Sequence, residues 1–211
     1  MKRGKFITLE GMDGAGKSTH LAWLPAFLEA RGVRVRLTRE PGGTPMGEKL
    51  RELMLDKNQQ LHADTEALLM FAARREHLDK VILPALNSGE WVPCDRFTDA
   101  TFAYQSGGSG LAWESIAALE NWVQGDVRGG VQPDLTLYFD VPAEVGKART
   151  NAVRTPDRFE QEGQSFFDRV REAYRRRVRE NPARMHLIDG TAALAEVKKA
   201  VEHKIISICF K

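Results

Sequence analysis

The segment Gly11-Met12-Asp13-Gly14-Ala15-Gly16-Lys17-Ser18 follows the apolar run Phe6-Ile7-Thr8-Leu9 after one residue, Glu10. It matches the pattern G-x-x-x-x-G-K-[ST] of a phosphate-binding loop between a strand and a helix. A strand that turns into a helix start aims several backbone N–H groups at one point, where the helix dipole adds partial positive charge. Chance would produce these letters in roughly one chain in a hundred of this length. We therefore expect a nucleoside triphosphate site here.

The residue types in this loop suit that task. Glycines allow positive φ angles and a close approach of the backbone to phosphate. Lys17 is expected to reach the β- and γ-phosphates, and the Ser18 hydroxyl to ligate Mg²⁺. The residues expected to contact the triphosphate are Gly11, Met12, Asp13, Gly14, Ala15, Gly16, Lys17, Ser18 and Thr19.

The composition favours one folded domain over residues 1–211. The chain is 42% hydrophobic, which is enough for one substantial core. Its 31 basic and 29 acidic residues nearly cancel, so a nucleic-acid partner is not expected. Cys94 and Cys209 form no C-x-x-C pair, and we find neither a signal peptide nor a membrane-spanning run. We expect a cytoplasmic protein with no membrane partner.

Short β-rich runs alternate with longer helical runs along the chain. This alternation predicts an α/β fold with a five-stranded parallel sheet flanked by helices on both faces. Pro93 lacks a donor for a central strand, but we keep that strand because Asp95 follows it. The predicted strands are 6–9, 33–37, 91–94, 135–139 and 185–188. The predicted helices are 17–31, 47–55, 65–87, 99–105, 113–124, 144–151, 166–180 and 194–206.

Polar residues follow four of the predicted strands, where ligands bind in open α/β sheets. They are the phosphate loop, Arg39-Glu40-Pro41-Gly42-Gly43, Asp95-Arg96 and Asp140. Their convergence predicts one cleft with two kinds of ligand. Asp95 is expected to position Mg²⁺, directly or through water, and Arg96 and Arg75 to hold an acceptor's phosphate or base. On these residues alone, an ordinary ion pair at the strand end would explain Asp95-Arg96 equally well.

A phosphotransferase also needs cations around the transferred group and exclusion of water. The polar, arginine-rich stretch 150–163 is a candidate closing lid. The base-reading motif N-K-x-D of guanine-nucleotide switch proteins does not occur in the sequence, which disfavours that class. A kinase for another nucleoside monophosphate and a phosphate-loop ATPase remain as alternatives.

Five segments follow one another in a set order: EGMDGAGKST at 10–19, TREPGGT at 38–44, FAARR at 71–75, DRFTDATFAYQ at 95–105 and DRFEQE at 157–162. In this order they resemble the successive motifs of bacterial thymidylate kinases over nearly the whole chain. The resemblance implies a phosphate-loop nucleoside-monophosphate-kinase fold with a lid segment. It also implies transfer of the γ-phosphate of ATP to dTMP with Mg²⁺, giving dTDP and ADP, and a homodimer formed through helices.

The resemblance also implies roles for individual residues on the acceptor side. Phe71 matches the residue that stacks on thymine, although helical periodicity alone favours a place in the core. Arg75 matches the arginine that hydrogen-bonds the base, and Arg96 the residue that grips the dTMP phosphate. The remaining expected contacts are Asp13 with the sugar 3′-OH and phosphate region, Thr101 and Gln105 with thymine, and Tyr104 with the deoxyribose C2′.

The lid departs from the family pattern. Members without an arginine in the phosphate loop supply it from the lid, often as R-x-R-x-R. Here Asn151 and Val153 interrupt that series after Arg149. The residues implied in catalysis are Lys17, Arg96, Arg149, Arg154 and Arg158. Which lid arginine contacts the transferred phosphoryl group stays open, and Arg149 against adenine is an alternative.

Overall fold

The computed structural model describes residues 2–125, 130–151, 158–159 and 162–210. Its strands form one parallel sheet in the order β2-β3-β1-β4-β5. The strands are β1 (Phe6–Glu10), β2 (Thr38–Arg39), β3 (Val92–Asp95), β4 (Leu135–Asp140) and β5 (Met185–Asp189). The predicted parallel five-stranded sheet is confirmed. Every residue of β1 and β4 is buried, as expected for strands covered on both faces.

The second strand differs from its prediction at 33–37. It is only a bridge between Val35 and Trp91, followed by the two-residue β2. Trp91 donates to Arg34 O and accepts from Arg36 N, whereas Val92 donates to Lys5 O across the other side. Because bonding direction alternates along a parallel strand, the nitrogen of Pro93 faces the second strand and has no hydrogen to donate. The ladder is therefore interrupted beside Pro93, while β3 stays internal.

Helical segments connect the strands. They are α1 (Lys17–Glu29), α2 (Pro45–Leu55), α3 (Ala63–His77), η1 (Leu78–Ile82), α4 (Leu83–Asn87), α5 (Thr98–Thr101), η2 (Phe102–Gly108), α6 (Trp113–Glu120), η3 (Asn121–Gly125), α7 (Ala143–Asn151), α8 (Gln164–Glu180) and α9 (Leu194–Cys209). The three η segments have π-helical hydrogen bonding and continue neighbouring α-helices, so the predicted helix 65–87 is α3, η1 and α4 in one run. No described helix is long and apolar enough to cross a membrane.

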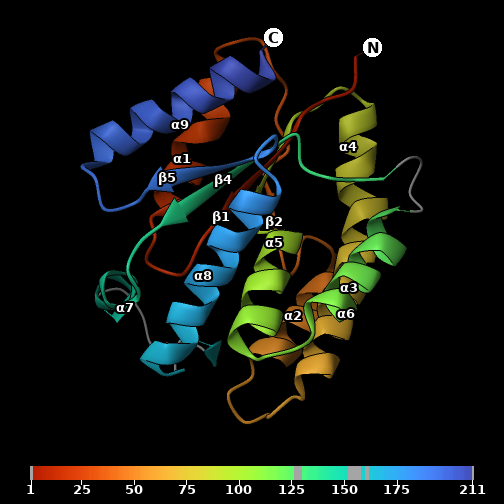
Figure 1. Ribbon diagram of the computed structural model, residues 1–211. Helices are drawn as coiled ribbons and strands as arrows, with labels where there is room; N and C mark the ends of the chain where they lie inside the picture. The colour runs from red at the N-terminus through yellow and green to blue at the C-terminus, as the bar shows by residue number, and fades with distance from the viewer. Residues whose placement is uncertain (1, 126–129, 152–157, 160–161, 211) are drawn as a thin grey trace.

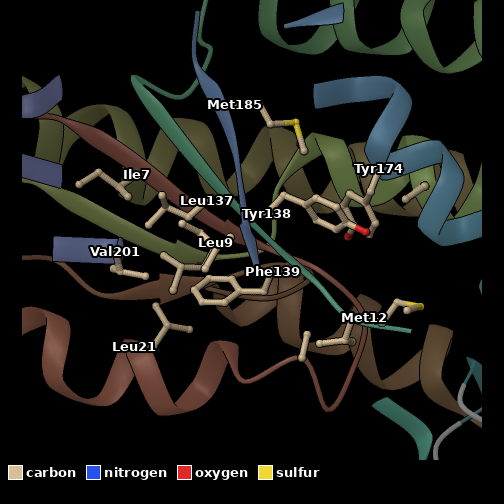
Figure 2. Packing of buried hydrophobic residues seen from close by; sticks show 14 of the residues in the cluster. Ile7, Leu9, Met12, Leu21, Leu137, Tyr138, Phe139, Tyr174, Met185 and Val201 are labelled. Carbon is tan, nitrogen blue, oxygen red and sulfur yellow. The ribbon is translucent and has the colours of Figure 1, made fainter. Parts of the chain in front are cut away.

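Helices cover both faces of the sheet (Figure 1). Tyr138 in β4 stacks on Tyr174 of α8 with ring centroids 4.8 Å apart, and the next residue, Phe139, stacks on His20 of α1 at 5.1 Å. Successive side chains of a strand point to opposite faces, so α1 and α8 lie on opposite sides. Figure 2 shows Leu21 on the Phe139 side and Tyr174 on the Tyr138 side.

Candidate active site

A cavity of about 690 Å³ lies at the carboxyl ends of β1, β2 and β3. The phosphate loop and the start of α1 form one wall, and α2, α3 and η2 contribute to the rest. The structure thus brings together three of the four predicted strand ends. Asp140, the last residue of β4, does not line this cavity and instead pairs with Arg171 and Arg175 of α8 at 2.8 and 2.7 Å.

The phosphate loop depends on its glycines for both conformation and space. Gly11, Gly14 and Gly16 have φ angles of 136°, 76° and 99°. A Cβ on Gly14 would lie 2.1 Å from the carbonyl oxygen of Gly146. Because this neighbour is backbone, it cannot move aside as the end of a flexible side chain can. Gly16 is the N-cap of α1, and no side chain caps that helix start. The first-turn N–H groups are therefore left to a ligand or water.

Lys17 lies buried against its own loop. Its Nζ donates to the carbonyl oxygens of Gly11 and Met12 at 2.9 and 3.0 Å and lies 3.9 Å from Asp13 Oδ1. Burial, and the positive charge of Arg96, lower the pKa of Lys17. An anionic phosphate in the cavity would restore a favourable environment for its charged form.

Arg96 lines the cavity and contacts both the phosphate loop and η2. It is the non-glycine residue with positive φ in the described chain, at 68°. Its guanidinium donates to the hydroxyl oxygens of Tyr104 and Tyr174 at 3.2 and 3.3 Å and pairs with Asp13 at 3.1 Å. Burial alone would lower the pKa of Arg96, but the attraction of Tyr104 and Asp13 outweighs it and raises that pKa well above its usual value. Arg96 therefore presents a permanent positive charge.

Asp95 and Ser18 fit a magnesium site. Asp95 Oδ1 is buried and has no hydrogen-bond partner among the described residues, and the side chain lines the cavity with the exposed Ser18. No group of three or more His, Cys, Asp or Glu residues in the described chain could hold a metal by itself. Mg²⁺ commonly binds through one or two carboxylates together with substrate phosphates, so this sparse donor set suits it.

The structure does not bring Phe71 or Arg75 to the cavity. Phe71 is 2% exposed and belongs to the core beside Phe97 and Phe102. Arg75 points outward, where it pairs with Asp79 at 3.0 Å. One residue on an α-helix turns the side chain by about 100°. The preceding residues, Met70 and Arg74, therefore line the cavity instead, and the core interpretation of Phe71 fits the structure.

Arg74 is a cavity residue that the sequence analysis missed. It is 2% exposed, with Nε 2.8 Å from Glu40 Oε2 and Nη2 donating to Thr101 Oγ1 at 3.1 Å. Its Nη1 is buried without a partner among the described residues, and the residue lines the cavity. Two adjacent arginines on a helix look alike in sequence. Only the buried Glu40 on another segment distinguishes them.

Thr101, Tyr104 and Gln105 all line the cavity and are buried. Gln105 Nε2 donates to Glu66 Oε2 at 3.2 Å. The other oxygen of Glu66 lies 2.6 Å from Arg158 Nη2. This chain of contacts ties one end of the expected lid to the wall formed by α3 and η2.

The two described arginines of the expected lid, Arg149 and Arg158, have different surroundings. Arg149 lines the cavity and donates to the carbonyl oxygens of Gly190 and Gly14 at 3.1 and 3.3 Å. Arg158 does not line the cavity, because its Nε donates to Met54 O at 3.1 Å while Nη2 pairs with Glu66. Arg154 lies outside the described residues, as does most of the stretch 150–163.

Arg51 and Arg39 also line the cavity, although the sequence analysis assigned no substrate contact to either. Arg51 of α2 donates to Pro41 O at 2.9 Å, and burial followed by the charge of Arg39 lowers the pKa of Arg51. Arg39 pairs with Glu48 at 2.8 Å. Arg39 stands in a recognised motif, whereas Arg51 has no sequence signal beyond a place on a helix.

The comparisons with known proteins agree over nearly the whole chain. The family model described as thymidylate kinase matches residues 9–201. A thymidylate kinase of Nitrosospira multiformis is 60% identical over 98% of both chains, and one of Nitrosomonas europaea is 61% identical over 95% of this chain and 92% of its own. The crystal structure of thymidylate kinase from Ehrlichia chaffeensis is 35% identical, with a TM-score of 0.77, covering 96% of this chain and 99% of that one. The chain belongs to the thymidylate kinase family.

Proposed function

We propose that this protein transfers the γ-phosphoryl group of ATP to dTMP, giving dTDP and ADP. The observation that carries the proposal is the position of Arg96 in one cavity, between the phosphate loop and the wall of Arg74, Tyr104 and Gln105. A donor polyphosphate and an acceptor monophosphate can therefore meet at one arginine. Family membership supports the same reaction.

In the donor half, the loop amides and Lys17 hold the phosphates of ATP. The purine then extends toward Gly190, Ala192 and Leu194, which line the same cavity beside Arg149. Arg149 already bonds the carbonyl of Gly190. We therefore assign Arg149 to the donor nucleotide, while the contribution of Arg154 and Arg158 to the transferred group stays a prediction.

In the acceptor half, Arg96 holds the dTMP phosphate, and a planar guanidinium suits bidentate contact with phosphate oxygens. Arg74 takes the base-binding role that the motif suggests for Arg75, because Arg74 lines the cavity and its buried Nη1 has no partner among the described residues. Thr101 and Gln105 face the base. The ring of Tyr104 forms the wall that would exclude a ribose hydroxyl.

The reaction follows from placement and charge. The acceptor phosphate is an anion near neutral pH and needs no general base. Lys17 and Arg96 fix the two phosphates in line, and Asp13 steadies Arg96 from the loop side. Ser18 and Asp95 would hold Mg²⁺, which supplies charge neutralisation on the donor phosphates.

We further propose a homodimer in the cytoplasm. Trp122 is 68% exposed on η3 and Leu68 is 55% exposed on α3, two segments in contact with each other. Large exposed apolar side chains on neighbouring segments favour a protein partner. Analytical ultracentrifugation of the wild type against Trp122→Glu tests this, because a dimer formed through that face should shift to monomer.

An ADP-release assay tests the reaction. Purified protein with ATP and Mg²⁺ is compared without acceptor and with dTMP, dUMP, UMP, dCMP or dGMP. We expect strong stimulation by dTMP above all others. Stimulation mainly by another monophosphate would identify a different acceptor. Hydrolysis of ATP that no acceptor changes would identify a phosphate-loop ATPase and contradict the proposal.

A further inference from the structure

The orientation of Arg96 depends on Glu10, which reaches the Arg96 side chain through Tyr174. Glu10, the last residue of β1, is fully buried. Its Oε1 accepts from Phe97 N at 2.7 Å, and its Oε2 accepts from the hydroxyl of Tyr174 at 2.9 Å. The oxygen of Tyr174 in turn accepts from Arg96 Nη1 at 3.3 Å. One carboxyl group thus reaches both the backbone after Arg96 and the Arg96 side chain.

The backbone contact matters because Arg96 has a left-handed conformation. A φ of 68° in a residue with a Cβ is unfavourable and persists only when the surroundings hold it. Arg96 N donates to Leu9 O at 3.0 Å, and Phe97 N donates to Glu10. Both acceptors belong to the end of β1, directly before the phosphate loop.

Tyr174 is itself held firmly. Its ring stacks on Tyr138, as Figure 2 shows, and α8 packs closely on η2, the segment that carries Tyr104. A Cβ on Gly107 would lie 2.5 Å from Ala173 Cβ, so the two helical segments approach as near as glycine permits. The hydroxyls of Tyr104 and Tyr174 therefore flank Arg96 from two clamped segments.

The protonation state of Tyr174 fits its hydrogen bonds to Glu10 and Arg96. Burial raises the pKa of Tyr174 well above its usual value, and Glu10 raises it further, so Tyr174 keeps its hydroxyl proton. The Tyr174 hydroxyl donates this proton to Glu10 Oε2, and its oxygen keeps a lone pair that accepts from Arg96 Nη1.

We propose that Tyr174 and Glu10 are positioning residues for the acceptor phosphate: they orient the Arg96 guanidinium and touch neither substrate. This rests on the proposed role of Arg96. Removal of the Tyr174 hydroxyl should leave Arg96 charged but less well oriented. Binding of a phosphorylated acceptor should weaken, whereas binding of the nucleoside alone should not change.

The test compares dTMP with thymidine by isothermal titration calorimetry on the full-length protein. Tyr174→Phe keeps the ring and its stacking. We expect its affinity for dTMP to fall roughly tenfold, the size expected from a lost hydrogen bond to a charged group, with thymidine affinity unchanged. Tyr138→Phe is the matched control, because its hydroxyl bonds Asp140 at 2.8 Å instead of Arg96. It should leave both affinities at wild-type values.

A double-mutant cycle separates this inference from the proposed function. In an Arg96→Ala background, Tyr174→Phe should produce no further loss of dTMP affinity. If Arg96→Ala alone leaves dTMP affinity unchanged, the proposed role of Arg96 is wrong. If Arg96→Ala weakens dTMP binding but Tyr174→Phe does not, or weakens thymidine equally, the positioning role is wrong. Thermal unfolding of each variant identifies one that fails to fold, and Glu10→Gln then replaces Tyr174→Phe with the same expected selectivity.

Discussion

The guanidinium of Arg74 lies 2.8 Å from the carboxylate of Glu40, and both side chains are almost completely buried. Glu40 also bonds His77 Nδ1 at 3.0 Å, and His77 Nε2 bonds Thr38 Oγ1 at 2.6 Å. Burial would raise the pKa of Glu40, but the charge of Arg74 and the hydrogen bond from His77 together lower it. Glu40, directly after β2, therefore fixes Arg74 in the wall of the cavity.

This relationship predicts unequal effects for two adjacent arginines. Arg74→Gln should raise the KM for dTMP by roughly ten- to a hundredfold, because a charged donor to the acceptor is lost, worth about 1.5–3 kcal/mol. Arg75→Gln is the matched control and removes a surface pair with Asp79 and a 3.5 Å hydrogen bond to Val123 O, both away from the cavity. Its KM should stay within about twofold of wild type. Steady-state kinetics with varied dTMP decide, and a larger effect at Arg75 would restore the role implied by the motif.

The difference between Arg74 and Arg75 shows where sequence reasoning stops. The phosphate loop, Asp95 and Arg96 could be predicted because each sits at a strand end, and a parallel sheet brings those ends together. Arg74 lies on a helix, where one position changes the side chain's direction by about 100°. No local pattern sets that rotation. It follows from the pairing of Arg74 with Glu40, two residues 34 positions apart.

The same limit applies to the fold. β1 and β4 are short continuous apolar runs, and their prediction was accurate because burial on both faces leaves a clear signal. The second strand was misplaced, because its pairing depends on whether the facing residue of β3 can donate a hydrogen bond. Pro93 cannot. A strand's extent thus depends on its neighbour as well as on its own residues.

Lys17→Ala should lower kcat by at least about a hundredfold, the usual effect of losing one preorganised charge that stabilises a transition state. The fold should survive removal of the Lys17 ammonium. Burial disfavours the charged form of this group and lowers its pKa, which offsets the stability gained from its hydrogen bonds to the loop carbonyls. Coupled ADP-release kinetics measure the rate, and thermal unfolding provides the control. A purified, folded variant with near-normal kcat would contradict the assignment.

Lowering the pH should reduce the stability of the fold by protonating Asp99. Its carboxylate lies between Arg177 at 2.7 Å and Arg184 at 2.8 Å. Despite burial, these arginines lower the pKa of Asp99 to about 2 in the folded protein, against 3.8 for the unfolded chain. A lowered folded-state pKa gives stability that is present above the unfolded value and is lost as pH falls from 3.8 toward 2.

The free energy of unfolding, measured by urea titration from pH 6 down to pH 2, tests this contribution. Asp99→Asn should be less stable at pH 6 by roughly 3–5 kcal/mol, because the buried Arg177 and the half-buried Arg184 both lose the carboxylate that pairs with them. Its stability should also fall less steeply below pH 4. Other carboxylates titrate in both proteins, so only the difference between the curves reports Asp99. Parallel curves would show that Asp99 does not titrate as proposed.

The close approach of α8 and η2 should be sensitive to one methyl group. A Cβ on Gly108 would lie 2.5 Å from the Phe166 ring, and this ring cannot yield easily because it is 6% exposed. Gly108→Ala should cost about 1–3 kcal/mol of unfolding free energy. Gly163→Ala is the control: no described atom lies within 4 Å of its Cβ position, and at this N-cap the change should cost at most about 1 kcal/mol.

Because Tyr104 and Tyr174 stand on the two segments that would separate, Gly108→Ala should also weaken dTMP binding while ATP binding stays unchanged. Equal losses of affinity for dTMP and ATP would mean that the methyl group loosens the whole molecule instead of the cavity wall that carries Tyr104.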